Sequence, residues 1–357
     1  MNRVLVVGLH LRWDGVRQRP HHLLSRIAQH TPVIVIEEMF PASENRDEIR
    51  IEGNITIVRP LRARPYGAPL IDATGIASVR RLLAGRDPIV WLYTPMMNEL
   101  ADAFPKGRLV FDCMDELAAF DFAPPELLDR ERSLLARADV VFTGGRSLYE
   151  ARKGIGSKVH CYPSGVEFDR FADARRLPAH PLTREFLRPV VGYIGVIDER
   201  IDIELIAALA DSKLDLNIVL VGPVVKIDPA ILPRRVNVHY TGQIAYDLLP
   251  SFLAGFDAAL MPFARNKSTR YISPTKTLEY FAASVPVATT SIVDVITPYG
   301  DLVEVGDEPE AFIAAVDRAL HAEPERTARA AQIAKEQSWD RIAQAMWDDI
   351  AAVAATS

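Results

Sequence analysis

The sequence predicts an α/β protein made of two doubly wound domains, each built on a parallel β-sheet. Short, unbroken apolar runs alternate with segments of helical periodicity from one end of the chain to the other. Such runs are typical of strands buried on both faces of a parallel sheet, and their alternation with helices is typical of a layered α/β fold. The chain has 357 residues, 49% of them hydrophobic, which is enough for two domains of ordinary size.

The expected elements fall into two sets. In the first, the strands are 4–7, 33–36, 55–58, 89–92, 109–111, 140–142 and 159–162, and the helices are 21–29, 76–83, 125–136 and 146–152. In the second, the strands are 190–195, 216–221, 236–240, 258–261, 287–288 and 302–305, and the helices are 203–210, 248–253, 274–283 and 309–320. The two sets predict two Rossmann-like domains in tandem.

A stretch rich in proline and charge, residues 163–189, separates the two sets and has little strand character. Such composition is typical of an interdomain connection. We therefore expect an N-terminal domain over 1–168, a linker over 169–188 and a C-terminal domain over 189–337.

Two helices are expected at the end of the chain, over 323–335 and 339–351. The second carries one apolar stripe at helical spacing, made of Trp339, Ile342, Met346, Trp347 and Ile350. Core packing is the simplest role for such a stripe. We expect residues 338–357 to pack back on the N-terminal domain.

Charge and cysteine content narrow the function classes. The net charge is −6 and no long basic run occurs, which argues against nucleic acid as a partner. The two cysteines, Cys113 and Cys161, are expected to be free thiols, and the chain is expected to be cytoplasmic because neither a signal peptide nor a long apolar segment is evident. A basic stretch in the first third of the chain could contact the anionic inner face of a membrane. The stretch contains Arg59, Arg62, Arg64, Arg80, Arg81 and Arg86.

The strongest candidate site follows the predicted strand 258–261. Ser273 is an N-cap residue type, Pro274 suits a first helical position, and Lys276 adds positive charge to the same turn. Glu279 lies one turn later, where a carboxylate can accept two hydrogen bonds from a vicinal diol. This spacing suits a nucleotide diphosphate and its ribose. A capped surface helix with a Lys276–Glu279 ion pair explains the same residues and stays open as the alternative.

Residues 273–287 resemble the donor-site helix of GT-B glycosyltransferases of the large family-4-like group, which carry a segment similar to Pro-x-Lys-x-x-Glu-Tyr-x-Ala-x-x-x-Pro-Val. Residues 163–171, 191–195, 240–242 and 338–340 resemble other segments of that family in order and spacing. The resemblance implies a GT-B fold, two Rossmann-like domains facing a central cleft. It also implies a sugar-nucleotide site that includes Gly195, Arg200, Gly242, Ser273, Pro274, Thr275, Lys276 and Glu279.

Trp13 and residues 17–23 resemble a subset of bacterial cell-surface polysaccharide transferases. Arg17 and Arg19 are therefore expected to bind an anionic acceptor, such as a lipid-linked diphosphate. Asp115, or its neighbour Asp112, is expected to end a strand of the first domain and to act as a catalytic carboxylate, although capping of the next segment is an equal alternative. His21 is a second catalytic candidate.

The chain departs from the family pattern at three places. Tyr271 stands where many members have a glutamate for the donor sugar, and Arg200 alone replaces the usual Gly-Arg…Lys pair. Ser284 stands where glycine is common, at a position that often needs a positive φ. Because no Asp-x-Asp occurs, we expect no metal cofactor, so the positive charge for the diphosphate must come from helix amides, Lys276 and Arg200.

The predicted function is transfer of a sugar from a nucleotide diphosphate sugar to a sugar or lipid-linked hydroxyl acceptor in cell-surface polysaccharide or glycolipid synthesis. The resemblance favours retention of the anomeric configuration. Two alternatives stay open, a sugar-nucleotide 2-epimerase of the same fold and a non-catalytic sugar-nucleotide-binding protein. A nicotinamide dehydrogenase is disfavoured because Gly8-Leu9-His10 does not begin a G-x-G-x-x-G turn.

Overall fold

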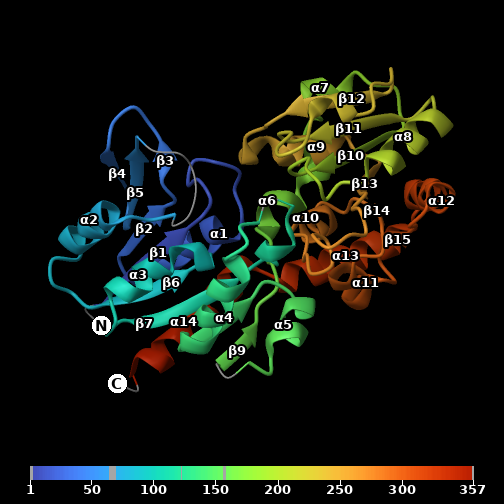
Figure 1. The fold of residues 1–357 in the computed structure, drawn as a ribbon. Coiled ribbons are helices and arrows are strands. Elements are labelled where there is room, and N and C mark those ends of the chain that lie inside the picture. Colours follow the sequence, from blue (N-terminus) through green and yellow to red (C-terminus); the bar gives the residue numbers. More distant parts are fainter. Residues whose placement is uncertain (1–2, 64–69, 122, 156–157, 356–357) are drawn as a thin grey trace. The chain divides into compact units, whose positions relative to one another are not determined.

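The computed structural model describes residues 3–63, 70–121, 123–155 and 158–355 (Figure 1). Contacts divide the chain into two compact units. Unit 1 contains Met1–Pro163 and Trp339–Ser357, and unit 2 contains Ser164–Ser338. Each has its own sheet and its own apolar core.

The sheet of unit 1 has the strand order β3-β5-β2-β1-β6-β7-β8-β9, with β4 paired antiparallel to β5 and all other pairs parallel. Its strands are β1 (Val4–Leu9), β2 (Val33–Glu37), β3 (Phe40–Pro41), β4 (Arg46–Glu52), β5 (Ile55–Arg62), β6 (Pro88–Leu92), β7 (Arg108–Cys113), β8 (Val140–Thr143) and β9 (Lys158–Cys161). Its helices are α1 (Arg19–Ile27), α2 (Ala73–Leu83), α3 (Asn98–Ala103), α4 (Leu127–Arg137), α5 (Arg146–Arg152) and α14 (Trp339–Ala355).

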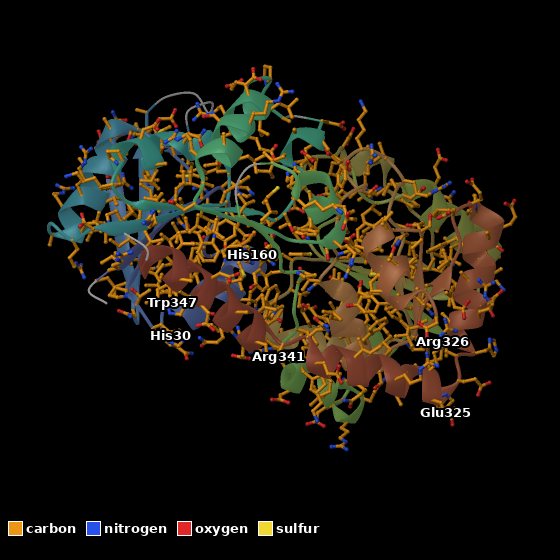
Figure 2. The ribbon with its side chains drawn as sticks, turned by 90° about the horizontal axis from the view of Figure 1, so that it is seen from below. His30, His160, Glu325, Arg326, Arg341 and Trp347 are labelled. Carbon is orange, nitrogen blue, oxygen red and sulfur yellow. The ribbon has the colours of Figure 1, made fainter. Side chains whose placement is uncertain are left out.

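The terminal helix α14 belongs to unit 1 and packs against α1, as the apolar stripe predicts. Trp339 and Met346 are fully buried in the unit 1 core, and the Trp339 indole stacks on His22 at a centroid distance of 4.9 Å. At the other end of α1, Trp347 lies beside His30 (Figure 2). The return of the last helix to the first unit is therefore confirmed.

The sheet of unit 2 is parallel throughout, with the order β12-β11-β10-β13-β14-β15. Its strands are β10 (Val190–Ile194), β11 (Asn217–Val221), β12 (Val238–Gly242), β13 (Ala258–Met261), β14 (Val287–Thr289) and β15 (Glu304–Val305). Its helices are α6 (Phe168–Ala172), α7 (Pro181–Arg184), α8 (Ile203–Ser212), α9 (Leu249–Gly255), α10 (Lys276–Ala282), α11 (Val293–Tyr299), α12 (Pro309–Leu320) and α13 (Pro324–Glu336). The central strand β10 is buried along its whole length.

Residues 169–188 do not form the expected linker. They contribute α6 and α7 to unit 2, and Phe171 and Ala174 are fully buried in its core. These helices were not predicted because they are short. Their few apolar residues show no helical periodicity, and the stretch is rich in proline and charge. The contacts place the first boundary at Pro163 and Ser164, ahead of the predicted one.

Strand β4 was also missed, because its sequence is mostly charged and six of its seven residues are exposed. A strand with one sheet partner can present polar side chains to water along its length. Periodicity therefore gave no signal for the β4–β5 hairpin.

The predicted basic stretch is not a continuous positive surface. Arg59 pairs with Glu37 at 2.6 Å and with Asp14 at 2.8 Å, and Arg62 is buried against Asp47 and Asp72. Arg64 lies outside the described residues. Within the described part of the chain, no helix is both long and apolar enough to cross a bilayer.

Candidate functional site

The carboxyl ends of β10 and β13 are the natural ligand position in unit 2. These strands are neighbours at the centre of the sheet, and the chain leaves them towards opposite sides, to β11 and to β14. Ligands bind at such a switch point in open α/β sheets. The backbone N–H of Ile194 donates to the Tyr280 hydroxyl at 2.8 Å, and this bond fixes α10 at the end of β10.

Lys276 and Glu279 lie on the first turn of α10 and contact each other. Lys276 Nζ donates to Glu279 Oε2 at 2.6 Å, and the side chains are 20% and 3% exposed. Burial raises the pKa of Glu279, against the opposing effect of the Lys276 charge. The helix begins two residues later than expected: Thr275, and not Ser273, is at the N-cap position, so Ser273 and Pro274 precede the helix.

The segment that begins unit 2 adds a second set of polar groups beside α10. Thr275 Oγ1 donates to Ser164 Oγ at 3.2 Å, and α6 packs against α10. Arg170 pairs with Glu167 at 3.1 Å, and the charge of Glu167 contributes to the raised pKa of Glu279.

Tyr246 lies between these groups. Its ring centroid is 5.1 Å from the Arg170 guanidinium carbon and 5.9 Å from Lys276 Nζ. Both cations therefore contact the aromatic ring as well as a carboxylate. The site is a compact arrangement of two cations, two glutamates and one aromatic ring.

Three glycines let the loops at the carboxyl ends of β10, β11 and β12 approach one another. A Cβ atom at Gly222 would lie 1.8 Å from the carbonyl oxygen of Gly195, and Gly222 forms a bridge with Gly242, whose φ is +70°. Gly195 itself donates its N–H to Val221. Close approach of these loops therefore requires glycine at 222, whereas the space beside Gly242 is open.

The Arg200 side chain forms an ion pair with Asp198, two residues earlier in the same loop. Its guanidinium donates to both carboxylate oxygens of Asp198, at 2.9 Å from Nε to Oδ1 and 2.7 Å from Nη2 to Oδ2. The Arg200 charge is thus shared with a carboxylate. A diphosphate would have to compete with Asp198 for it.

Arg19 is a core residue of unit 1 and not an acceptor ligand. It is 4% exposed, and its Nε lies 3.0 Å from Oδ2 of the fully buried Asp112. Its Nη1 donates to the Tyr162 carbonyl at 2.6 Å. Burial raises the pKa of Asp112 against the opposing Arg19 charge. The expectation for Arg19 was wrong because an arginine next to Pro20 has no sequence feature that reveals a buried partner 93 residues away.

His21 bonds both neighbouring backbone segments, and its expected catalytic role stays a prediction. Its Nδ1 accepts the backbone N–H of Gln18 at 3.1 Å, which leaves Nε2 to donate to the Trp13 carbonyl at 3.1 Å. Both ring nitrogens therefore have backbone partners in this structure. Burial lowers the pKa of His21, and the charge of Arg17 lowers it further.

Asp115 follows β7 and is half-buried, in the loop at the carboxyl edge of the unit 1 sheet. This loop packs on Gly144, where an added Cβ would lie 2.5 Å from the Met114 carbonyl oxygen. Behind the loop, buried Arg152 binds Glu116 at 2.8 Å and Glu131 at 2.7 Å. The surroundings fix the loop, and the catalytic role of Asp115 stays a prediction.

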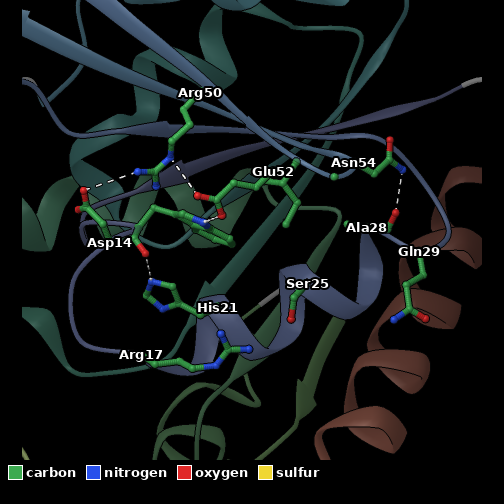
Figure 3. Close-up of a pocket in the computed structure, with 12 residues that line it drawn as sticks. Asp14, Arg17, His21, Ser25, Ala28, Gln29, Arg50, Glu52 and Asn54 are labelled. Carbon is green, nitrogen blue, oxygen red and sulfur yellow. Dashed lines mark hydrogen bonds and ion pairs between the residues drawn. The ribbon is translucent and has the colours of Figure 1, made fainter. Parts of the chain in front are cut away.

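Unit 1 also contains a cavity of about 560 Å³ beside α1 (Figure 3). Trp13, Arg17 and His21 line one end of it, and the β4–β5 turn lines the other. The cavity brings Trp13 close to Arg17, and neither the cavity nor the contribution of the hairpin was foreseen.

Comparison with known proteins gives three kinds of match. Residues 188–322 match the family described as Glycosyl transferases group 1. Over 294 residues the chain is 26% identical to the "Putative teichuronic acid biosynthesis glycosyltransferase TuaH" of Bacillus subtilis (strain 168), covering 76% of this chain and 73% of that protein.

Two solved structures match the entire chain and are matched over their entire length, both at 16% identity. Sucrose-phosphate synthase from Thermosynechococcus elongatus has a TM-score of 0.75, and α,α-trehalose 6-phosphate synthase from Burkholderia multivorans has a TM-score of 0.71. The chain is a GT-B glycosyltransferase.

In this glycosyltransferase, Gly195 and Gly242 follow or end strands of unit 2, and Thr275, Lys276 and Glu279 lie at the start of α10. Their role in binding a sugar nucleotide stays a prediction. Glu167, Arg170 and Tyr246 were not foreseen as part of the same cluster. Residues 163–171 resemble a segment of the family, but only the packing of this segment on α10 identifies which side chains lie near Glu279. Among the described residues, no three His, Cys, Asp or Glu side chains gather as a metal ion would require.

Proposed function

We propose that this glycosyltransferase moves a sugar from a nucleoside diphosphate sugar held by unit 2 to a hydroxyl acceptor held by unit 1, in the synthesis of a cell-surface polysaccharide or glycolipid. The Lys276–Glu279 arrangement on α10 carries the proposal. The name of the Bacillus subtilis relative supports the polysaccharide, and one structural relative is described as bound with UDP-2-fluoro glucose.

The two side chains suit different parts of such a donor. The Glu279 carboxylate accepts two hydroxyl hydrogen bonds from the ribose, and Lys276 binds the diphosphate and stabilises the charge that develops on it as the sugar leaves. Because Lys276 is already bonded to Glu279, donor binding exchanges that contact for one with the phosphate oxygens.

Charge on the diphosphate is neutralised without a metal ion in this proposal. Lys276 supplies the nearest cation, and Arg200 supplies a second only when it turns away from Asp198. Asp115 is proposed to accept the acceptor proton or to stabilise positive charge on the sugar, and the anomeric configuration is proposed to be retained. The 2-epimerase and the non-catalytic binding protein are not favoured by the family match.

A panel of nucleoside diphosphate sugars tests the function directly. Incubation of the full chain with each donor should produce slow release of the nucleoside diphosphate from one of them, at a rate that excess EDTA leaves unchanged. Interconversion of two sugar nucleotides without hydrolysis would contradict transfer. Complete loss with EDTA and recovery with Mn²⁺ would contradict the metal-independent mechanism.

Contact with the inner membrane face is proposed to depend on Arg80, Arg81 and Arg86, since Arg59 and Arg62 are paired with carboxylates. Sedimentation with vesicles that contain anionic lipid, compared with neutral vesicles, measures it.

A further inference from the structure

The unit 1 cavity runs beside α1 (Figure 3). It begins at the loop after β1, at the carboxyl edge of the sheet, where Trp13 and Arg17 lie. It continues beside α1 to the β4–β5 turn at Gly53 and Asn54 (Figure 3). Since α1 has nine residues, its length is about 14 Å. The cavity is therefore elongated and lies wholly within one unit.

Its walls combine apolar surface with charged side chains of both signs. Arg17 and Arg50 face the cavity together with Asp14 and Glu52, and Arg50 pairs with both carboxylates. An alkyl chain offers no hydrogen bonds to these side chains, and the balanced charge gives a phosphate no net attraction. Hydroxyl groups both donate and accept, so a polyhydroxylated ligand suits charged side chains of either sign.

Trp13 gives the cavity a fixed aromatic wall. Its backbone N–H donates to Glu37 at 2.7 Å, its indole N–H donates to Glu52 at 2.8 Å, and its carbonyl bonds His21. The His21 ring lies 4.9 Å from the Trp13 ring. An indole held in this way offers an apolar face to the C–H groups of a sugar without a loss of side-chain freedom on binding.

The far end of the cavity is equally well fixed. Asn54 Nδ2 donates to the Ala28 carbonyl at 2.7 Å, which ties the β4–β5 turn to the end of α1. Ser25 and Gln29 line the helix side between the two ends. The amide groups of Gln29 and Asn54 again suit hydroxyl partners.

We propose that this cavity binds an oligosaccharide, namely the sugars of a growing glycan that lie behind its reacting end. The inference rests on the proposed function, because it assigns a polymeric acceptor to the same enzyme. It requires affinity to rise with chain length, since a monosaccharide fills only part of the cavity.

Calorimetric titration of the full chain with malto-, cello- and galacturono-oligosaccharides, each as monomer, dimer, tetramer and hexamer, tests the proposal. In at least one series the tetramer should bind about tenfold or more tightly than the monomer. Trp13→Ala should remove most of this gain. Ser25→Tyr, which places a ring in the middle of the cavity, should weaken the tetramer by a similar factor.

Ser133→Tyr is the matched control, because Ser133 is exposed on α4 and does not line the cavity. It should bind like the parent. Affinity that does not depend on chain length, equal binding by parent and Ser25→Tyr, or no binding in any series would overturn the proposal.

The parent is also titrated with nucleoside diphosphates. Nucleotide binding without oligosaccharide binding removes this inference alone. Oligosaccharide binding without any nucleotide binding or donor hydrolysis removes the proposed function and leaves the cavity a saccharide site.

Discussion

The ammonium nitrogen of Lys276 lies 2.6 Å from Oε2 of Glu279, one turn further along α10. The carboxylate is almost fully buried, while the lysine side chain is partly exposed above it. Tyr280, the next residue, binds the end of β10 and fixes the turn. The cation Lys276 and the carboxylate Glu279 are therefore held in fixed positions at the switch point of the sheet.

Removal of each group should give a different pattern of lost affinity. Glu279→Ala should weaken both nucleoside and nucleoside diphosphate about 10- to 100-fold, because a charge-assisted hydrogen bond contributes about 1.5–3 kcal/mol and the ribose is present in both ligands. Lys276→Ala should weaken only the diphosphate. Calorimetry with the two ligands measures both effects.

Arg132→Ala is the control for that experiment. Arg132 pairs with Asp129 at the same three-residue spacing, but on an exposed face of α4. It should bind both ligands like the parent. If Glu279→Ala binds both ligands like the parent, α10 is a helix with a local Lys276–Glu279 ion pair and does not bind a nucleotide.

Nucleoside binding should weaken on acidification at a higher pH than an ordinary glutamate would cause. Burial raises the pKa of Glu279 above its usual 4.5, and the diol needs the ionised form. A nucleoside is the correct probe, because it carries no phosphate that titrates in the same range. In Glu279→Gln the affinity should be lower and independent of pH between neutrality and the usual glutamate pKa.

The same shift has a consequence for stability. Because the folded-state pKa of Glu279 is higher than the unfolded value, the protonated carboxyl favours folding. This contribution is complete below pH 4.5 and is lost as the pH rises through the folded-state pKa. The free energy of unfolding of the parent should therefore fall relative to Glu279→Gln over that interval. An unchanged difference across it would contradict the raised pKa.

The buried Arg19–Asp112 pair should be essential to unit 1. Asp112→Ala leaves the Arg19 charge buried without its carboxylate and should cost about 3–5 kcal/mol. The double variant Arg19→Met, Asp112→Leu should recover part of that loss. The four tryptophans, at positions 13, 91, 339 and 347, all lie in unit 1, so the denaturant dependence of tryptophan fluorescence reports its unfolding. A loss below about 1 kcal/mol in Asp112→Ala would contradict the paired core.

Ser284→Gly should stabilise unit 2 by about 1 kcal/mol. Ser284 has a φ of +53° after α10, as its place in the family pattern suggested, and an L-residue there costs about that much. Ser251→Gly, within α9, is the matched control and should destabilise, because glycine weakens a helix interior. Thermal unfolding followed by far-UV circular dichroism compares the two. Destabilisation by Ser284→Gly would contradict the strained backbone.

Residues near one another in sequence account for the Lys276–Glu279 arrangement on α10. Lys276 and Glu279 are three residues apart, so helical periodicity alone places them on one face. Burial of Glu279 is different, since it depends on Glu167 and Tyr246, which approach only when α6 and the loop before α9 pack on α10. No pattern in the sequence links those positions.

Arg17 and Arg19 also differ in a way that tertiary packing decides and local sequence does not. They are two residues apart and of one type, yet one lines a cavity and the other is buried against Asp112. The difference follows from the direction in which each side chain leaves the start of α1. Trp13 and the hairpin strand β4 line the cavity together because the Trp13 indole N–H donates to Glu52, a contact between segments 39 residues apart.

The sequence by itself determined two parallel α/β domains, the return of the last helix to the first of them, and the position of α10 at a strand end, because each rests on local apolar periodicity and turn chemistry. The tertiary structure alone decided that 169–188 is part of unit 2, that Arg19 is a core ion-pair partner, that His21 supports Trp13, and that an elongated cavity runs beside α1. These features depend on contacts between distant segments, and the energies that select them arise from burial and charge pairing that no local pattern records.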